Sequence, residues 1–350
     1  MKLKFIGFLL FVVAFLSLPN EGLTQDRHFS QFYSAPIYLS PALTGAYEGN
    51  FRVGLNYRDQ WRRTLDNPFT TSSGYVDLRL KSPFNTARND YFAVGVLFFT
   101  DKVPAVDFNT NQIGFSAAFH KALDVKSSQY LSFGLQLGLN SRNINFEKLR
   151  FADQFDGITG YSFPTNEVYP INNFAFGDLS TGIHYSNRLR TGLSIYGGVA
   201  MHHLLEPTIS FEQTGIALDQ LNRKYTIYGG AEYLLREGIS VIPRVFAMLQ
   251  GKHAEYTIGS NVRLAPNDYS GYSFYLGGWL RSVQDTDTPF RPDAVVILTG
   301  IEFNNILFGL SYDVNLGNFT TNQWGRQALE FSIGYLGEHE TNDGVICPKF

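Results

Sequence analysis

Residues 131–140 alternate apolar with polar or small side chains, and read Leu131-Ser132-Phe133-Gly134-Leu135-Gln136-Leu137-Gly138-Leu139-Asn140. Successive side chains of a β-strand point to opposite faces, so one face of this stretch carries only Leu and Phe. A helix would need apolar residues three and four positions apart. The same alternation recurs at residues 51–58 and 255–264. These patterns predict an all-β protein.

The strand-like segments number about fourteen, and some span about nine to eleven residues. A tilted strand of this length crosses a bilayer, whereas ordinary globular strands have about five or six residues. Long and tight connections tend to alternate between them, as in outer-membrane barrels, although the connection at residues 251–253 is tight where a long loop is expected. We therefore predict a single transmembrane antiparallel β-barrel of outer-membrane type. Its strands are expected at 51–59, 70–81, 91–100, 111–120, 129–141, 173–186, 191–203, 223–235, 239–250, 254–264, 271–281, 293–302, 306–315 and 327–336.

Composition agrees with this fold class and excludes others. The chain has 350 residues with 28 Lys and Arg against 31 Asp and Glu, so it lacks the basic excess of a nucleic-acid-binding protein. Charged residues make up 17% of the chain and aromatic residues 15%. A soluble β-sandwich or lectin-like secreted protein remains the alternative, because its strands alternate too. Strand length, aromatic content and the presence of a single cysteine, Cys347, argue against it.

The N-terminus predicts export. Lys2 and Lys4 precede an apolar run at 5–18, which has the character of a secretory signal peptide with cleavage near Gln25. The run is shorter than the roughly 20 residues of a membrane-spanning helix. After Gln25, the longest strongly apolar stretch is about nine residues, at 91–99. We therefore expect a mature chain in the outer membrane of a Gram-negative cell.

The predicted organisation has four parts. Residues 1–24 form the signal peptide, 25–50 an N-terminal periplasmic or plug segment, 51–336 the barrel, and 337–350 a C-terminal periplasmic tail. An even number of strands returns both termini to the periplasm. The long loops near 142–172 and 204–222 would then face the cell exterior.

A search for chemistry predicts no catalytic, cofactor-binding or metal site, because the sequence lacks the nucleophile, zinc and phosphate-loop motifs. His202 and His203 are adjacent on a predicted strand, so they are expected to point to opposite faces and cannot jointly hold a metal. Asp153 and Asp156 lie in the longest predicted loop, where carboxylates can bind Ca²⁺, but their spacing matches no EF-hand. Solvated loop acids are the favoured interpretation.

The densest mixture of charged and aromatic side chains lies at residues 57–63, at the end of the first predicted strand. Aromatic side chains favour the membrane–water interface, so an interfacial aromatic beside loop charges is the preferred interpretation. The alternative is a polar network inside the barrel or a contact site for a partner.

Seven short segments stand out along the chain. In order, they are Gln25-Asp26-Arg27-His28-Phe29-Ser30-Gln31-Phe32-Tyr33, Ser40-Pro41-Ala42-Leu43-Thr44-Gly45, Tyr57-Arg58-Asp59-Gln60-Trp61, Pro68-Phe69-Thr70-Thr71, Ser311-Tyr312-Asp313-Val314-Asn315, Leu329-Glu330-Phe331-Ser332-Ile333-Gly334-Tyr335 and Cys347-Pro348-Lys349-Phe350. Taken in this order, the segments resemble the PorP/SprF family of type IX secretion system membrane proteins. One departure is Ser40, where the family usually has Asn before Pro-Ala.

The resemblance implies an outer-membrane barrel without catalytic activity that acts in type IX secretion and in surface gliding. It implies periplasmic partners, namely a peptidoglycan-binding lipoprotein and ring subunits, and a large adhesin or other secreted protein as cargo. Outer-membrane lipid is the further expected partner, and no cofactor or nucleic acid is expected. The residues expected to contact a partner or face the lumen are Phe29, Ser30, Gln31, Pro41, Ala42, Gly45, Tyr57, Arg58, Gln60, Trp61, Ser311, Tyr312, Asp313, Cys347, Pro348 and Phe350.

A second hypothesis comes from another functional class. An outer-membrane channel for small or hydrophobic solutes, porin-like or similar in build to fatty-acid transporters, would have the same strand pattern. An open lumen that conducts ions would favour the channel. A lumen closed by residues 25–50, together with stable retention of partners, would favour the secretion component. A lipid hydrolase finds no support in the sequence.

Overall fold

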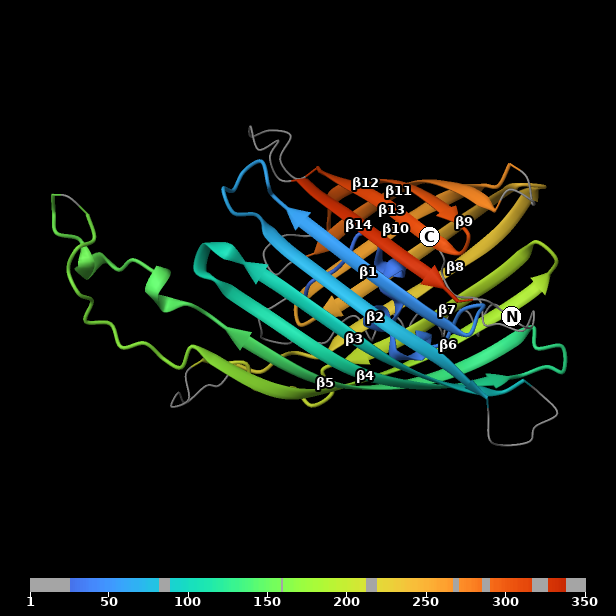
Figure 1. The fold of residues 1–350 in the computed structure, drawn as a ribbon, viewed down its shortest axis with the longest axis horizontal. Coiled ribbons are helices and arrows are strands. Elements are labelled where there is room, and N and C mark those ends of the chain that lie inside the picture. Colours follow the sequence, from blue (N-terminus) through green and yellow to red (C-terminus); the bar gives the residue numbers. More distant parts are fainter. Residues whose placement is uncertain are drawn as a thin grey trace.

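The computed structural model describes residues 26–81, 89–158, 160–211, 219–266, 271–284, 290–316 and 327–337. The strands form one closed antiparallel barrel in which each strand pairs with its neighbours in sequence and β1 pairs with β14 (Figure 1). The prediction of an outer-membrane-type barrel of about 14 strands is confirmed. No helix within the described ranges is long and apolar enough to cross a membrane.

Each predicted strand coincides with an observed one, and the ends differ by a few residues. The strands are β1 (Phe51–Gln60), β2 (Phe69–Lys81), β3 (Tyr91–Val103), β4 (Phe108–Ala122), β5 (Gln129–Asn143), β6 (Asn173–Arg190), β7 (Leu193–His202), β8 (Lys224–Arg236), β9 (Ile239–Gln250), β10 (His253–Leu264), β11 (Tyr272–Gln284), β12 (Arg291–Phe303), β13 (Ile306–Asn315) and β14 (Gln327–Leu336). The short helical elements are η1 (Phe32–Ser34), α2 (Pro36–Leu39), η2 (Pro41–Leu43), η3 (Pro104–Val106), η4 (Phe146–Lys148) and η5 (Ala152–Gln154).

The alternation in β5 has the polarity of a membrane barrel. The apolar side chains face outward, and Leu137 is 64% exposed, whereas Ser132 and Gln136 are buried inside the barrel. A soluble sheet would bury the leucines. Apolar side chains on the outside and polar ones inside are typical of strands that cross lipid.

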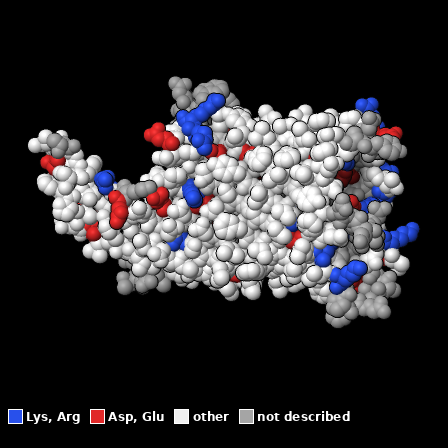
Figure 2. All heavy atoms as spheres, in the orientation of Figure 1, with Lys and Arg blue, Asp and Glu red and all other residues white. Residues whose placement is uncertain are grey.

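Charge is distributed as this arrangement requires. Figure 2 shows Lys, Arg, Asp and Glu gathered mainly toward the two ends of the barrel, with few charges on the wall between them on the face shown. Exposed Leu, Ile, Val and Phe side chains occupy this wall. An outer surface of this kind fits the hydrocarbon layer of a membrane.

The two ends of the barrel differ, and we name them by what they carry. The terminal end carries the start of β1 and the end of β14, where Arg52 is paired with Leu336. It also carries tight turns at 191–192, 237–238 and 304–305.

The loop end, opposite, carries residues 144–158 and 160–172, which project far from the barrel in Figure 1. The loop end also carries the tight β9–β10 connection, which follows Gln250 and precedes His253. Gly251 there has a φ of +57°, a conformation that suits glycine and allows a tight turn. The β9–β10 connection therefore lies at the loop end, as the alternation of strand directions requires, although it is short.

The N-terminal segment, residues 26–50, lies inside the barrel. Asp26 contacts Gln250 at the loop end, and Glu48 forms an ion pair with Arg188 near the terminal end. The segment therefore runs through the lumen from the loop end to the terminal end before β1 begins. The main cluster of buried apolar residues joins this segment to the inner wall, so the core of the molecule lies within the lumen.

Candidate functional site

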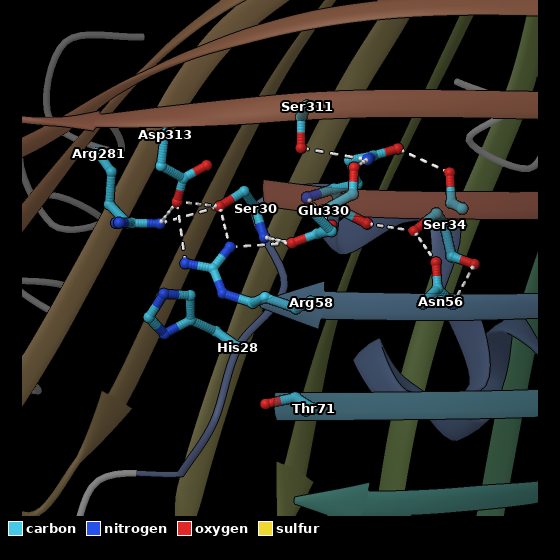
Figure 3. A network of polar contacts seen from close by, with 12 residues as sticks. His28, Ser30, Ser34, Asn56, Arg58, Thr71, Arg281, Ser311, Asp313 and Glu330 are labelled. Atoms are coloured by element: carbon cyan, nitrogen blue, oxygen red, sulfur yellow. Dashed lines mark hydrogen bonds and ion pairs between the residues drawn. The ribbon is translucent and has the colours of Figure 1, made fainter. Parts of the chain in front are cut away.

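The N-terminal segment is held by buried ion pairs and hydrogen bonds that we call the seam network, because it lies where β1, β13 and β14 close the barrel (Figure 3). The strands supply charged side chains at inward positions, and the segment supplies backbone and hydroxyl groups. The network consists of Ser30, Gln31, Arg58, Arg281, Ser311, Asp313 and Glu330.

Glu330 binds the backbone of the N-terminal segment. Its carboxylate accepts hydrogen bonds from the backbone N–H groups of Ser30 and Gln31, each at 2.8 Å. Arg58 Nη1 donates to Glu330 Oε2 at 2.9 Å. Glu330 and Arg58 are 0% and 1% exposed, so neither charge is compensated by bulk water. A buried ion of this kind depends on its partners.

Asp313 completes the network on β13. Its Oδ2 atom accepts hydrogen bonds from the Ser30 hydroxyl at 2.7 Å, from Arg58 at 2.9 Å and from Arg281 at 2.9 Å. The Gln31 amide donates to the hydroxyl of Ser311 at 3.1 Å. The structure thus brings together five residues that the sequence singled out in three separate segments.

A second group, the rim cluster, fixes the segment at the loop end. Its members are Asp26, Asp178, His203, Lys224 and Gln250. The Asp26 carboxylate lies 2.8 Å from both Lys224 Nζ and His203 Nε2, and His203 Nδ1 lies 2.7 Å from Asp178. Burial alone would lower the pKa of His203, but the two carboxylates outweigh it and raise the pKa to about 9. Burial acts to raise the pKa of Asp26, but Lys224 and His203 outweigh it and hold this pKa well below its usual value.

The expectation that His202 and His203 point to opposite faces of a strand is wrong. β7 ends at His202, and His203 has a φ of +60°, which turns its ring into the lumen. The two rings lie 6.3 Å apart between centroids, and His202 faces the carbonyl oxygen of Leu39. Among the residues that the structure describes, no group of His, Cys, Asp and Glu is suited to hold a metal ion.

Aromatic side chains hold the segment at mid-depth. Phe32 stacks on Phe246 with ring centroids 4.9 Å apart and meets Trp279 edge to face at 5.8 Å. Phe29 packs edge to face against Phe99 at 6.2 Å. Such aromatic pairs add to the free energy gained by burying the rings.

Glycines in the wall allow the backbone of the segment to approach closely. A Cβ atom at Gly134 would lie 2.3 Å from backbone atoms of Pro41 and Ala42. Gly45 has a φ of +75°, and its N–H donates to Asp77 at 2.7 Å. The predicted residues Pro41, Ala42 and Gly45 therefore lie against the inner wall.

The remaining predicted residues lie elsewhere. Tyr57 faces outward from β1 and is exposed, whereas Gln60 ends the strand half-buried. Trp61, with a φ of +66°, donates its N–H to the Gln327 carbonyl at 2.8 Å and packs on Phe69. Tyr312 is half-buried and donates a hydrogen bond to Gln327. Cys347, Pro348 and Phe350 lie outside the described residues.

Several residues of the site were missed by sequence reasoning. Arg281, Glu330, Asp26, His203 and Lys224 all hold the segment, yet none was selected. The signal for Arg281 and Glu330 was present in the alternation, because each is a charged residue at an inward position of a predicted strand. The signal for His203 was absent, because it depends on a single backbone angle.

The segment does not fill the lumen completely. A cavity of about 580 Å³ remains toward the terminal end, between the segment and the walls of β1, β7, β8 and β9. Its lining includes Tyr33, Tyr47, Arg52, Tyr196 and Arg244. Arg244 lies over the ring of Tyr33 at 4.2 Å and donates to the hydroxyl of Tyr196 at 2.9 Å, so the cavity is lined by mutually bonded side chains.

Solved structures resemble the barrel only distantly. The toluene transporter TodX of Pseudomonas putida shares 12% identity, covers 91% of this chain and 98% of its own, and superposes with a TM-score of 0.48. The toluene transporter TbuX of Ralstonia pickettii shares 11% identity, covers 92% of this chain and 100% of its own, and superposes with a TM-score of 0.47. A FadL homologue of Pseudomonas aeruginosa shares 11% identity, covers 90% of this chain and 99% of its own, and superposes with a TM-score of 0.48. No curated protein matches the chain.

A family model identifies the chain at the level of sequence. The model for the type IX secretion system membrane protein PorP/SprF matches residues 22–335. This match spans the N-terminal segment, β1 to β13 and all but the last residue of β14, so it includes both sides of the seam network. The protein is an outer-membrane β-barrel that belongs to the PorP/SprF family of type IX secretion system membrane proteins.

Proposed function

We propose that this protein is a non-enzymatic outer-membrane component of the type IX secretion and gliding machinery. It helps to export a partner adhesin or other secreted protein, or to anchor it at the cell surface. Family membership supports a role in the secretion machinery and in contact with its components and cargo. The observation that carries the finer proposal is the N-terminal segment, which runs through the lumen and is bonded to the wall by the seam network and by the rim cluster.

This arrangement favours an interaction protein over an open channel. A channel for solutes needs a continuous path, whereas this lumen contains Phe32, Phe246 and Trp279 packed together at mid-depth. Removing the segment would leave Glu330 and Asp313 without the donors of Ser30 and Gln31. The cost of keeping these buried carboxylates with fewer hydrogen-bond donors favours the segment in place. Residues 25–50 thus act as a plug, and the barrel acts as a membrane anchor.

The proposal assigns an orientation. Cleavage of the signal peptide near Gln25 releases the mature chain, and the terminal end of the barrel faces the periplasm. Residues 337–350 then offer a tail to the peptidoglycan-binding lipoprotein and the ring subunits. The loop end, with residues 144–172, faces the exterior, where secreted cargo is held.

Affinity purification of the tagged protein from membranes in mild detergent, followed by mass spectrometry, tests the proposal. Recovery of type IX ring subunits or the lipoprotein, together with one large surface protein, is the expected result. Planar-bilayer recordings of the wild type and of a variant lacking residues 26–47 provide the second measurement. A wild-type protein that conducts ions and purifies without partners would replace this proposal with the channel hypothesis.

A further inference from the structure

One segment at the loop end has a structure of its own. We call residues 144–158 and 160–172 the arm; it lies between β5 and β6 and extends away from the barrel wall at the left of Figure 1. Other loops described at this end stay closer to the barrel (Figure 1). Because the arm lies beyond the ends of the strands, the hydrocarbon layer around the barrel does not cover its side chains.

Two aspartates hold the outer half of the arm in a fixed conformation. The Asp156 carboxylate accepts hydrogen bonds from the N–H groups of Ile158 at 2.9 Å and Gly160 at 3.0 Å, and from the hydroxyl of Ser162 at 3.0 Å. The Asp153 carboxylate accepts from the N–H of Asn166 at 2.7 Å. This hydrogen bond lowers the pKa of Asp153, although burial acts weakly in the opposite direction. Asp153 is an exposed loop acid, as expected, and both carboxylates also organise the backbone of the arm.

The inner half of the arm is held by aromatic stacking. The rings of Phe146 and Tyr169 are parallel within 3° and lie 5.2 Å apart, and Phe151 packs on the same tyrosine at 5.8 Å. These contacts, like those of the aspartates, lie within the arm. A preformed element loses little conformational entropy when a partner binds, which favours recognition.

The arm presents apolar side chains that the described part of the chain leaves exposed. Ile158 is 88% exposed and Val168 is 92% exposed. Phe155, Tyr161 and Phe163 are each about half exposed, and the rings of Phe155 and Tyr161 pair at 5.4 Å. Exposed aromatic and aliphatic side chains gathered on a preformed element are typical of interaction sites.

The net charge of the arm indicates which kind of partner can bind it. The arm sequence contains four acidic residues, Glu147, Asp153, Asp156 and Glu167, against the basic residues Lys148 and Arg150. A net negative arm is repelled by the phosphates of a lipid surface and by a second copy of itself. A protein surface with an apolar pocket bordered by Lys and Arg complements both its apolar side chains and its charge.

We propose that the arm is the docking element for the secreted protein held at the cell surface, and that it inserts Phe155, Ile158 and Phe163 into an apolar, basic-rimmed pocket on that protein. This inference rests on the proposed function, and it adds the surface that makes the contact and the chemistry of the partner. The plug and the periplasmic contacts have no part in it.

The test replaces the apolar side chains and leaves the barrel intact. A triple variant, Phe155→Ser with Ile158→Asp and Phe163→Ser, is compared with Val125→Asp, which changes a 79%-exposed side chain in the β4–β5 connection at the terminal end. The probe is the surface protein that copurifies with the wild type. Loss of buried aromatic anchors should lower its recovery at least about tenfold in the triple variant. Val125→Asp should recover it normally, and both variants should retain the ring subunits and the mobility of a folded barrel on unheated gels.

A second variant tests the charge separately and does not alter the apolar residues. Glu147→Lys with Glu167→Lys reverses the net charge of the arm, so recovery of the surface protein should fall, with less dependence on salt. Normal recovery by both arm variants would overturn the inference while leaving the proposed function standing. Binding of the wild type to lipopolysaccharide vesicles, or its dimerisation, that is lost in the triple variant would overturn it in favour of a membrane or a second copy. Failure of the wild type to recover any surface protein would overturn the proposed function itself.

Discussion

Arg58 on β1 and Glu330 on β14 face each other across the line where the barrel closes. They are directly paired in the register of the two strands, and Arg58 Nη1 lies 2.9 Å from Glu330 Oε2. The same Glu330 carboxylate accepts two backbone N–H groups of the N-terminal segment. One carboxylate therefore joins the first strand, the last strand and the segment in the lumen.

Arg58→Met should destabilise the barrel. The substitution leaves Glu330 and Asp313 buried with less positive charge, and breaking a buried pair of this kind costs about 3–5 kcal/mol. The folded fraction, measured by gel mobility of unheated samples across a urea series, should show the loss. Arg62→Met is the control, because Arg62 is exposed and pairs with Asp59 at the loop end, and it should lower the urea midpoint far less. Equal midpoints for Arg58→Met and wild type would show that the seam network contributes no stability.

Stability should depend on pH through His203. Its pKa is about 9 in the folded protein and about 6.5 in an unfolded chain. The folded protein therefore holds this proton more tightly, and the stabilisation is complete below about pH 6.5 and is lost as the pH rises through about 9. His203→Gln should flatten the fall of the urea midpoint over this range. Asp26→Asn, which keeps the imidazole, should move the fall to lower pH. A slope that is identical in wild type and His203→Gln would contradict the assignment.

Gly134→Val should displace the N-terminal segment from the wall. A Cβ atom there would lie 2.3 Å from Pro41 and Ala42, and overpacking of this kind costs about 1–3 kcal/mol. We expect faster proteolysis within residues 26–50 and a larger ion conductance in planar bilayers. Gly177→Val, on the neighbouring strand, is the matched control, since its Cβ would meet nothing within 4 Å. Wild-type proteolysis and conductance in Gly134→Val would show that the close approach is unimportant.

Phe32→Ala should destabilise the protein more than the same change on the outer wall. Phe32 stacks on Phe246 and meets Trp279 edge to face inside the lumen, and core Phe→Ala changes cost about 3–5 kcal/mol. Phe98→Ala removes a ring that is 49% exposed on the outward face of β3, and should cost less. Urea midpoints in the same lipid give the comparison. A larger loss for Phe98→Ala would place the main core outside the lumen.

The alternation of side chains was sufficient to predict the strands, because the period of two follows directly from strand geometry. It was insufficient for the contacts inside the lumen. The sequence showed that Asp313 could face inward, but its partner Ser30 is distant in the sequence and approaches it only because the segment runs through the barrel. Likewise, the direction of the His203 ring follows from its positive φ, which the neighbouring sequence does not predict. The local alternation of side chains thus predicts the strands of the barrel wall, whereas the contacts in the lumen depend on residues that are distant in the sequence.

The path of the segment has a consequence for biogenesis. β13 and β14 are the last of the described strands to be synthesised, yet Asp313 and Glu330 accept hydrogen bonds from Ser30 and Gln31, among the first of the described residues. A barrel that closed around an empty interior would bury these carboxylates with too few donors, which disfavours such a closed intermediate. Closure of the barrel can therefore depend on the N-terminal segment, because β13 and β14 pair stably only when Ser30 and Gln31 already lie in the lumen.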